Sequence, residues 1–130
     1  MTKKLESSFV NYGAALKKLE EFSELPVKND RDRAGIIQAF EFTFEVSWKT
    51  VQKAVEKQGL PAGSPKLAFK AAFQVGWIKE SEQDIWLQML EDRNLTTHTY
   101  KEDLALEIFS RIQKSYIPAL KVLLERMEKS

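Results

Sequence analysis

Ten consecutive residues, EDRNLTTHTY (Glu91–Tyr100), bring together the side chains of this chain that are best suited to act on a phosphate. They include the only histidine, His98, with Arg93 five positions before it and Tyr100 two positions after it. Arginine supplies a permanently charged planar fork, an imidazole changes protonation state near neutral pH, and a phenol both donates and accepts hydrogen bonds. Because a lone histidine near a helix end is more often structural than catalytic, the residue types alone leave both interpretations open.

Two long helices are expected before this segment, because apolar residues recur there at helical spacing. The first covers residues 3–25, and its apolar seam consists of Leu5, Phe9, Tyr12, Leu16 and Leu19. The second covers residues 30–58, with Asp30 as its N-cap and Gly59 at its C-terminal end. It is the most aromatic element and is apolar on more than one side, which is typical of a central helix or of one that meets a partner.

Shorter elements follow the second helix. Ser64 and Pro65 predict the cap and the first residue of a third helix, which Gly76 closes. The pattern Ser81-x-x-Asp84 resembles a capping box and predicts the start of a fourth helix, which carries Arg93 in its last turns.

The last helix is expected to begin just after the EDRNLTTHTY segment, because Thr99-x-x-Glu102 is a capping box. It runs to about residue 128, and Pro118 should kink it. No strand-like alternation interrupts the helical pattern. We therefore predict a single all-α domain over residues 1–130, a four- to five-helix antiparallel up-and-down bundle.

The break between the last two helices matters for the chemistry. On a straight helix Arg93 and His98 lie about 140° apart, since each residue turns the helix by about 100°. A helix break at the Thr99 cap would end the regular rotation of about 100° per residue before His98. The side chain of His98 could then point towards Arg93.

A polar row on the second helix offers supporting side chains. Its members, at helical spacing, are Gln38, Glu41, Glu45, Lys49, Gln52 and Glu56. One interpretation is a solvated face with a Glu45–Lys49 pair that contributes a few tenths of a kcal/mol. The other is that Glu41 or Glu45 faces Arg93 and supports the site.

Composition narrows the classes of function. The net charge of +1 gives no global basic field to hold a long duplex, so any contact with nucleic acid must be local. The absence of cysteine and the single histidine argue against a metal site, and Gly59–Gly63 does not match a phosphate-binding loop, so no cofactor is expected. No run approaches the ~20 apolar residues that span a membrane, and the N-terminus lacks the apolar run of a signal peptide. These features predict a soluble cytoplasmic protein.

The residue types of the segment suit RNA cleavage without a metal. RNA carries its own nucleophile, the 2′-hydroxyl, whose proton a neutral imidazole can take, while an imidazolium can protonate the leaving 5′-oxygen. Arg93 would bind the phosphate and the charge that develops on it, and Asn94 would orient the phosphate or the histidine. One histidine per chain cannot be base and acid at once, whereas a symmetric dimer would bring two.

The pattern Arg-x4-His-x-Tyr, with Asn94 directly after the arginine, resembles the signature of the HEPN family of small helical proteins. More narrowly, the chain resembles the prokaryotic branch encoded beside a minimal nucleotidyltransferase, whose members are called nucleotidyltransferase substrate-binding proteins or toxins of toxin–antitoxin pairs. The resemblance covers nearly the whole chain, including QAFEFTFEVSWK (residues 38–49) and LPAGSPKLAFKAAF (residues 60–73).

This resemblance implies a homodimer with a composite site, an RNA substrate, and Arg93 and His98 as catalytic residues. It also implies that Tyr100 receives AMP from the partner nucleotidyltransferase, which would silence the nuclease by adding charge and bulk. Packing of Tyr100 on the bundle is the other interpretation of that residue. Two other functions stay open: a non-catalytic subunit that binds a nucleotide or substrate for the nucleotidyltransferase, and a module that only mediates interactions.

Overall fold

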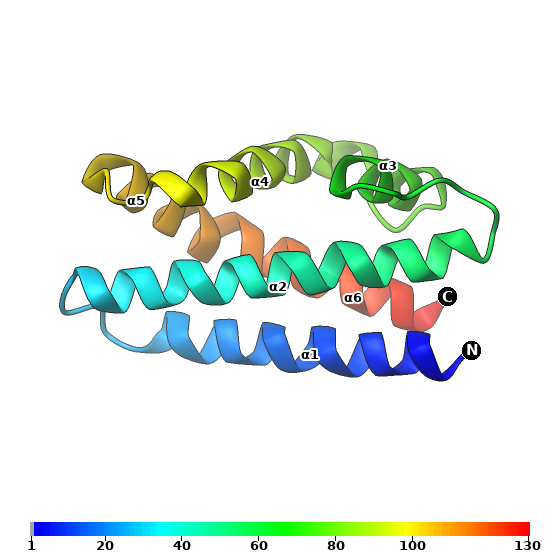
Figure 1. Ribbon diagram of the computed structural model, residues 1–130, viewed down its shortest axis with the longest axis horizontal. Coiled ribbons are helices and arrows are strands. Elements are labelled where there is room, and N and C mark those ends of the chain that lie inside the picture. Colours follow the sequence, from blue (N-terminus) through cyan, green and yellow to red (C-terminus); the bar gives the residue numbers. More distant parts are fainter. Residues whose placement is uncertain (1) are drawn as a thin grey trace.

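The computed structural model describes residues 2–130, and every regular element in that range is a helix (Figure 1). The six α-helices are α1 (Lys3–Glu24), α2 (Asp30–Glu56), α3 (Pro65–Gln74), α4 (Gln83–Leu95), α5 (Glu102–Arg111) and α6 (Ile117–Lys129). Three short turns join them: η1 (Glu80–Glu82), η2 (Thr96–His98) and the π-helical η3 (Ile112–Tyr116). The all-α prediction is confirmed. None of the described helices is long and apolar enough to cross a membrane.

The helices form a bundle in which successive long elements reverse direction (Figure 1). α1 and α2 run antiparallel along their whole lengths, and α6 passes beside both. α3 packs on the C-terminal half of α2, and α4 returns along the bundle towards the N-terminal end of α2. The end of α4 therefore reaches the first half of α2, where α5 begins.

A chain of aromatic rings crosses the core and ties four elements together. Phe40 and Phe44 of α2 lie 6.1 Å apart between ring centroids, and Phe40 stacks on Tyr116 of η3 at 5.4 Å. Phe44 meets Phe69 of α3 at 5.6 Å, and Phe69 meets Trp86 of α4 at 4.6 Å. Such pairs contribute about 0.5–1.5 kcal/mol each beyond their burial, so they fix how α4 sits over α2.

The ends of α2 follow local signals, with one shift. Asn29, not Asp30, is the N-cap, because its side-chain oxygen accepts a hydrogen bond from the backbone N–H of Asp32 at 2.9 Å. At the other end Gly59 has a φ of +78°, and the N–H of Leu60 donates to the carbonyl of Val55 at 3.2 Å. This is the pattern of a Schellman motif, so the prediction that Gly59 ends the helix is confirmed.

The same kind of local signal sets α3. The Ser64 hydroxyl accepts from the N–H of Leu67 at 3.2 Å, and Pro65 occupies the first helical position. Gly76, with a φ of +88°, closes the helix. Both predictions are confirmed.

The start of α4 differs from the prediction that Ser81 begins it. The turn η1 precedes the helix, and the Glu82 carboxylate accepts from the N–H of Lys79 at 2.8 Å. Glu82 is also held by Arg126 of α6 through two bonds of 2.5 and 3.1 Å, which keep the pKa of this carboxyl below its ordinary value. Glu82 thus makes a local contact and a long-range contact at the helix entrance, and the N-cap position is Lys79 instead of Ser81.

The expected last helix is divided into α5 and α6. The π-helical turn η3 separates them, and Pro118 is among the first residues of α6. Proline cannot donate a backbone hydrogen bond and crowds the carbonyl four residues earlier, and a wider π-helical turn relieves both problems. The predicted irregularity at Pro118 is thus present, and it takes the form of an inserted turn.

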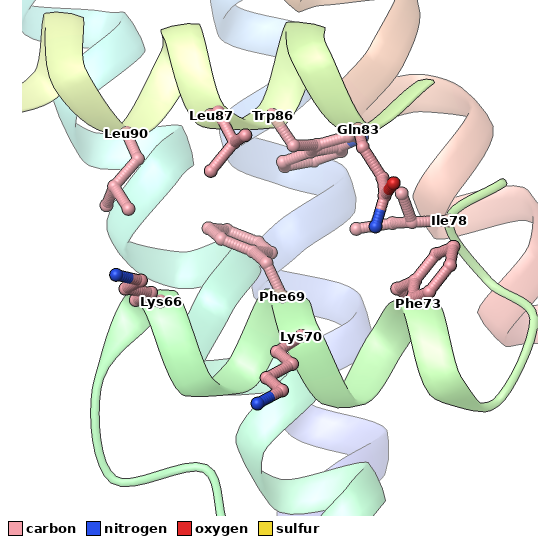
Figure 2. Close-up of a pocket in the computed structure, with 9 residues that line it drawn as sticks. All are labelled: Lys66, Phe69, Lys70, Phe73, Ile78, Gln83, Trp86, Leu87 and Leu90. Carbon is pink, nitrogen blue, oxygen red and sulfur yellow. The ribbon is translucent and has the colours of Figure 1, made fainter. Parts of the chain in front are cut away.

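An apolar groove of about 340 Å³ lies between α3 and α4 (Figure 2). Its lining includes Phe69 and Phe73 from α3 and Trp86, Leu87 and Leu90 from α4. Leu87 is 58% exposed, so α4 presents apolar surface to solvent on this side.

Candidate functional site

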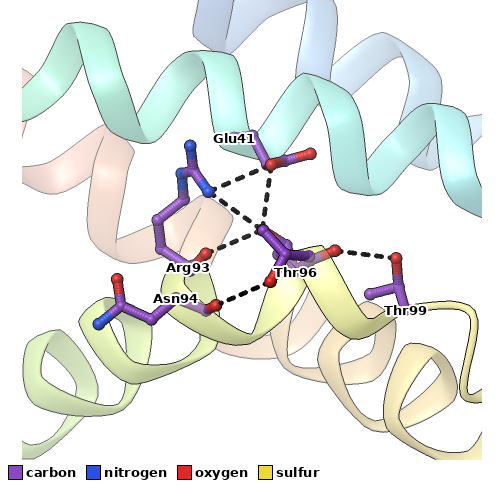
Figure 3. Close-up of polar contacts among 6 residues, drawn as sticks. Glu41, Arg93, Asn94, Thr96 and Thr99 are labelled. Carbon is purple, nitrogen blue, oxygen red and sulfur yellow. Dashed lines mark hydrogen bonds and ion pairs between the residues drawn. The ribbon is translucent and has the colours of Figure 1, made fainter.

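Arg93 is held at the end of α4 by two side chains (Figure 3). Its Nη1 lies 3.2 Å from a carboxylate oxygen of Glu41 on α2 and donates to the hydroxyl of Thr96 at 3.1 Å. The Thr96 hydroxyl also lies 3.0 Å from the same Glu41 oxygen. Thr96 is buried, whereas the side chains of Arg93 and Glu41 are each 30% exposed. The guanidinium is therefore oriented but still reachable from solvent.

Of the two carboxylates expected near Arg93, only Glu41 contacts it. Glu45 pairs instead with Lys49, one turn along α2, at 3.3 Å. Both members of this pair are well exposed, with side-chain exposures of 43% and 53%. Glu45 thus belongs to the solvated face that was the other interpretation of the polar row.

The break after α4 exists, but Thr99 does not create it by capping α5. The Thr99 hydroxyl donates to the carbonyl of Thr96 at 3.0 Å, and the N-cap position of α5 is Lys101, with no hydrogen bond from its side chain. The chain turns because η2 continues α4 for three residues in a tighter form, and the N–H of Lys101 donates to the carbonyl of His98 at 3.0 Å. Backbone bonds within the turn therefore replace the predicted capping box.

His98 and Tyr100 form a second pair on the surface of this turn. Nδ1 of His98 lies 3.1 Å from the Tyr100 hydroxyl, and Tyr100 is 76% exposed. His98 is exposed as well, so the turn directs it to Tyr100 and to solvent. The hydrogen bonds found within residues 2–130 tie Arg93 to Thr96 and His98 to Tyr100, and none joins Arg93 to His98. Asn94 is exposed on the turn of α4 that carries Arg93 (Figure 3).

A buried polar cluster lies directly behind this surface, and sequence reasoning missed it. Asp92, expected to be a charge at a helix end, is completely buried. Arg111 donates to its two oxygens at 2.6 and 2.9 Å, and the Tyr116 hydroxyl donates to it as well. Hydrogen bonding to Asp92 raises the pKa of Arg111, and burial raises the pKa of Tyr116. The cluster fixes the end of α4 against α5 and η3, and so it sets the direction in which Arg93 points.

One signal in the sequence could have identified Asp92. Trp86, Met89 and Asp92 are spaced by three residues, and all three are buried on one side of α4. A carboxylate in line with an apolar stripe needs a partner, because an unpaired buried charge is very costly. Its partners are 19 and 24 residues away in the chain, so no local pattern names them.

The family comparison matches almost the entire chain. Residues 7–129 fit the family model described as "Nucleotidyltransferase substrate binding protein like". A relative in Haemophilus influenzae, named probable ribonuclease HepT, is 31% identical over 84 residues. This match covers 61% of the present chain and 56% of that relative, so the chain matches little more than half of the relative's length.

Two solved structures have the same fold. A protein of Thermus thermophilus superposes with a TM-score of 0.82 and 39% identity, over 88% of this chain and 97% of that one. A tri-AMPylated HEPN toxin of Shewanella oneidensis, solved in complex with an MNT antitoxin, superposes with a TM-score of 0.80 over the full length of both chains. At 15% identity, the second likeness concerns the fold alone.

Proposed function

Because the chain belongs to the nucleotidyltransferase substrate binding protein-like family of HEPN proteins, we propose that it is a metal-independent RNA endonuclease. It would act as the toxin of a toxin–antitoxin pair whose other member is a minimal nucleotidyltransferase. The observation that carries the proposal is the end of α4, where Glu41 and Thr96 orient Arg93 and where His98 stands exposed five residues later.

The geometry assigns separate tasks to the two catalytic candidates. Nδ1 of His98 is engaged by the Tyr100 hydroxyl, so Nε2 is the nitrogen that would meet the substrate. When Nδ1 carries the proton and donates it to Tyr100, Nε2 holds a lone pair and can take the proton of the 2′-hydroxyl. Arg93 would bind the phosphate and stabilise its developing charge, with Asn94 beside it.

A second copy of the chain would supply the general acid, because one histidine cannot hold and release the proton at the same moment. Leu87, Leu90 and Asn94 are spaced by three and four residues, so they share a face of α4 beside the site. This face borders the apolar groove of Figure 2. A two-fold interface that buries it would bring two copies of the His98 turn together, and we propose a homodimer of this kind.

Tyr100 is the proposed point of regulation. Its exposed hydroxyl would attack the α-phosphorus of ATP on the partner enzyme, which would join AMP to the tyrosine and release pyrophosphate. The added phosphate would stand where the hydroxyl now contacts His98 at 3.1 Å. Negative charge and bulk at that point would oppose the phosphate of an RNA substrate. The AMPylated toxin of Shewanella oneidensis supports this proposal by its fold.

The alternative is a non-catalytic subunit that holds a nucleotide for the nucleotidyltransferase. It is favoured by the hydrogen bonds of the described residues, which join Arg93 to Thr96 and His98 to Tyr100 but do not join Arg93 to His98. The same arginine and histidine would then bind a phosphate without acting on it.

Cleavage of RNA by the purified protein in EDTA separates the two functions. We expect products that end in 2′,3′-cyclic phosphate, and we expect His98→Ala to lose at least about 100-fold in rate, since a general acid–base group contributes 10²–10⁴-fold. Thr97→Ala, a change of the exposed neighbour, is the matched control and should cut normally. Retained cleavage in His98→Ala would contradict the mechanism, and no cleavage by the unmodified dimer would favour the nucleotide-binding subunit.

A further inference from the structure

A second cavity, of about 330 Å³, has Tyr100 among its lining residues. It lies between the first turns of α2, the turn at Thr99 and Tyr100, and the start of α5. Its volume is at the lower end of the range of about 300–1,000 Å³ for small-molecule sites. Because Tyr100 lines the cavity and contacts His98 at 3.1 Å, a ligand in it would lie beside the proposed catalytic histidine.

The lining combines apolar walls with three charged side chains. The walls include Ala34, Ile37 and Ala105, and the charged side chains are Asp30, Arg33 and Glu102. Such a lining suits a flat, uncharged ring with a polar edge.

Arg33 is held by contacts with two neighbouring side chains. Its Nη1 donates to Asp30 at 2.8 Å, and its guanidinium lies 5.8 Å from the centre of the Phe109 ring. The side chain is only 18% exposed, and its Nε is buried without a hydrogen-bond partner among the described residues. Because Nε has no surface that a ligand could reach, the N–H groups of Nη1 and Nη2 are the donors that would meet a ligand with an acceptor edge.

The balance of charge argues against a phosphate in this cavity. Two carboxylates accompany one guanidinium, and Asp30 already neutralises that guanidinium. A base that offers donors to a carboxylate and acceptors to an arginine would fit instead. Guanine meets both needs, because N1–H and the N2 amino group can donate together to one carboxylate, while O6 and N7 accept from arginine. Adenine and cytosine place an acceptor beside their amino donor, and uracil has a single N–H between two carbonyls.

We propose that this cavity binds a guanine base of the substrate, and so makes the enzyme prefer RNA with guanine next to the scissile phosphate. The inference rests on the proposed ribonuclease function. The placement supports it, because Arg33, Ile37 and Glu41 follow one another at four-residue steps on one face of α2, which spans about 12 Å. Glu41 holds Arg93 at one end of this face, and the cavity lies at the other.

The test measures binding in the His98→Ala variant, which should bind RNA without cutting it. Fluorescein-labelled pentamers UUGUU, UUAUU, UUCUU and UUUUU are compared by fluorescence anisotropy. We expect UUGUU to bind about tenfold more tightly than the other three, since a bidentate base contact discriminates by about that factor or more.

Two further changes, added to His98→Ala, locate the preference. Glu102→Gln removes the carboxylate from the cavity lining and should abolish the preference for guanine. The control is Asp103→Asn, which makes the same change of charge on the next residue of α5, outside the cavity lining, and should keep the preference. Ala34→Leu places a larger side chain in the cavity and should also abolish the preference. Leucine has a high helix propensity, so the change should not disturb α2.

The outcomes keep this inference apart from the proposed ribonuclease activity. If the protein prefers guanine, if that preference depends on Glu102, and if the unmodified protein cuts no RNA, then the guanine subsite is supported and the ribonuclease function is rejected. Equal affinity for the four pentamers, or a preference that survives in both Glu102→Gln and Ala34→Leu, would overturn the subsite. Cleavage could still occur in that case, and it would show no preference for guanine.

Discussion

Two arginine–carboxylate pairs anchor the end of α4, and their α4 members are adjacent in the sequence. Asp92 is fully buried and receives two bonds from Arg111 and a third from Tyr116. Arg93 makes a single contact of 3.2 Å with Glu41, and both side chains are 30% exposed. Arg111 is 32% exposed, much as Arg93 is, so the two pairs differ chiefly in the burial of their carboxylates. Neighbouring residues of a helix point about 100° apart, and one turn of α4 therefore buries Asp92 in the core and leaves Arg93 within reach of solvent.

The difference between the pairs is one of role. Breaking a buried pair by removing one partner costs about 3–5 kcal/mol, because the remaining charge has lost its compensation. An exposed pair is worth about 0.2–1 kcal/mol. The Asp92 cluster can therefore hold the helix end in place, while the Arg93–Glu41 pair can exchange its carboxylate for a substrate phosphate at little cost.

The largest effect is expected from Asp92→Asn. The amide keeps the shape of the carboxylate but removes the charge that accepts bonds from Arg111 and Tyr116, so we expect the free energy of unfolding to fall by roughly 3 kcal/mol. Urea denaturation followed by circular dichroism measures this change. The double variant Asp92→Leu/Arg111→Met removes both charges and should recover much of the loss. If the free energy of unfolding of Asp92→Asn falls by less than about 1 kcal/mol, the Asp92–Arg111 pair stabilises the fold no more than a surface pair does.

Local signals predicted the parts of the fold that local bonds determine. Ser64 and Gly59 cap helices as expected, because their partners lie within five residues in the chain. The predicted capping roles of Ser81 and Thr99 were wrong, although α5 does begin at Glu102, just after the EDRNLTTHTY segment, as predicted. Near Ser81 the N-cap position is Lys79, whose N–H donates to Glu82, and Glu82 is also bound by Arg126, 44 residues away. Thr99 uses its hydroxyl within the turn.

The candidate site was predictable only in part for the same reason. The spacing of Glu41 and Glu45 places both on one face of α2, and only the position of α4 along α2 decides which one meets Arg93. That position depends on long-range contacts, among them the stacking of Phe40 on Tyr116 and the Asp92 cluster. Sequence patterns identify the face of a helix, and the packing selects the residue.

A smaller effect is expected at Thr96, whose hydroxyl contacts both members of the Arg93–Glu41 pair. Thr96→Val keeps the shape of the side chain and removes the hydroxyl that contacts both Arg93 and Glu41, so it should lower the free energy of unfolding by about 1 kcal/mol. We also expect slower RNA cleavage, because Arg93 loses a bond that orients it. Thr97→Val is the matched control, since that exposed hydroxyl makes only a 3.4 Å contact with the Asn94 carbonyl. Equal effects of the two changes on unfolding and cleavage would show that Thr96 does not position Arg93.

The smallest effect on stability, and the sharpest test of the comparison, is expected from Glu41→Gln. Removing this partly exposed carboxylate should change the free energy of unfolding by only about 1 kcal/mol or less. Arg93 would then be released from competition with a carboxylate, so affinity for a short RNA should rise by up to about fivefold, as measured by anisotropy in the His98→Ala background. Glu45→Gln removes a charge from the same face of α2 but away from Arg93, and it should leave affinity almost unchanged. Weaker RNA binding by Glu41→Gln would mean that Glu41 holds Arg93 in its binding position. The Arg93–Glu41 pair would then be structural, as the Asp92–Arg111 pair is.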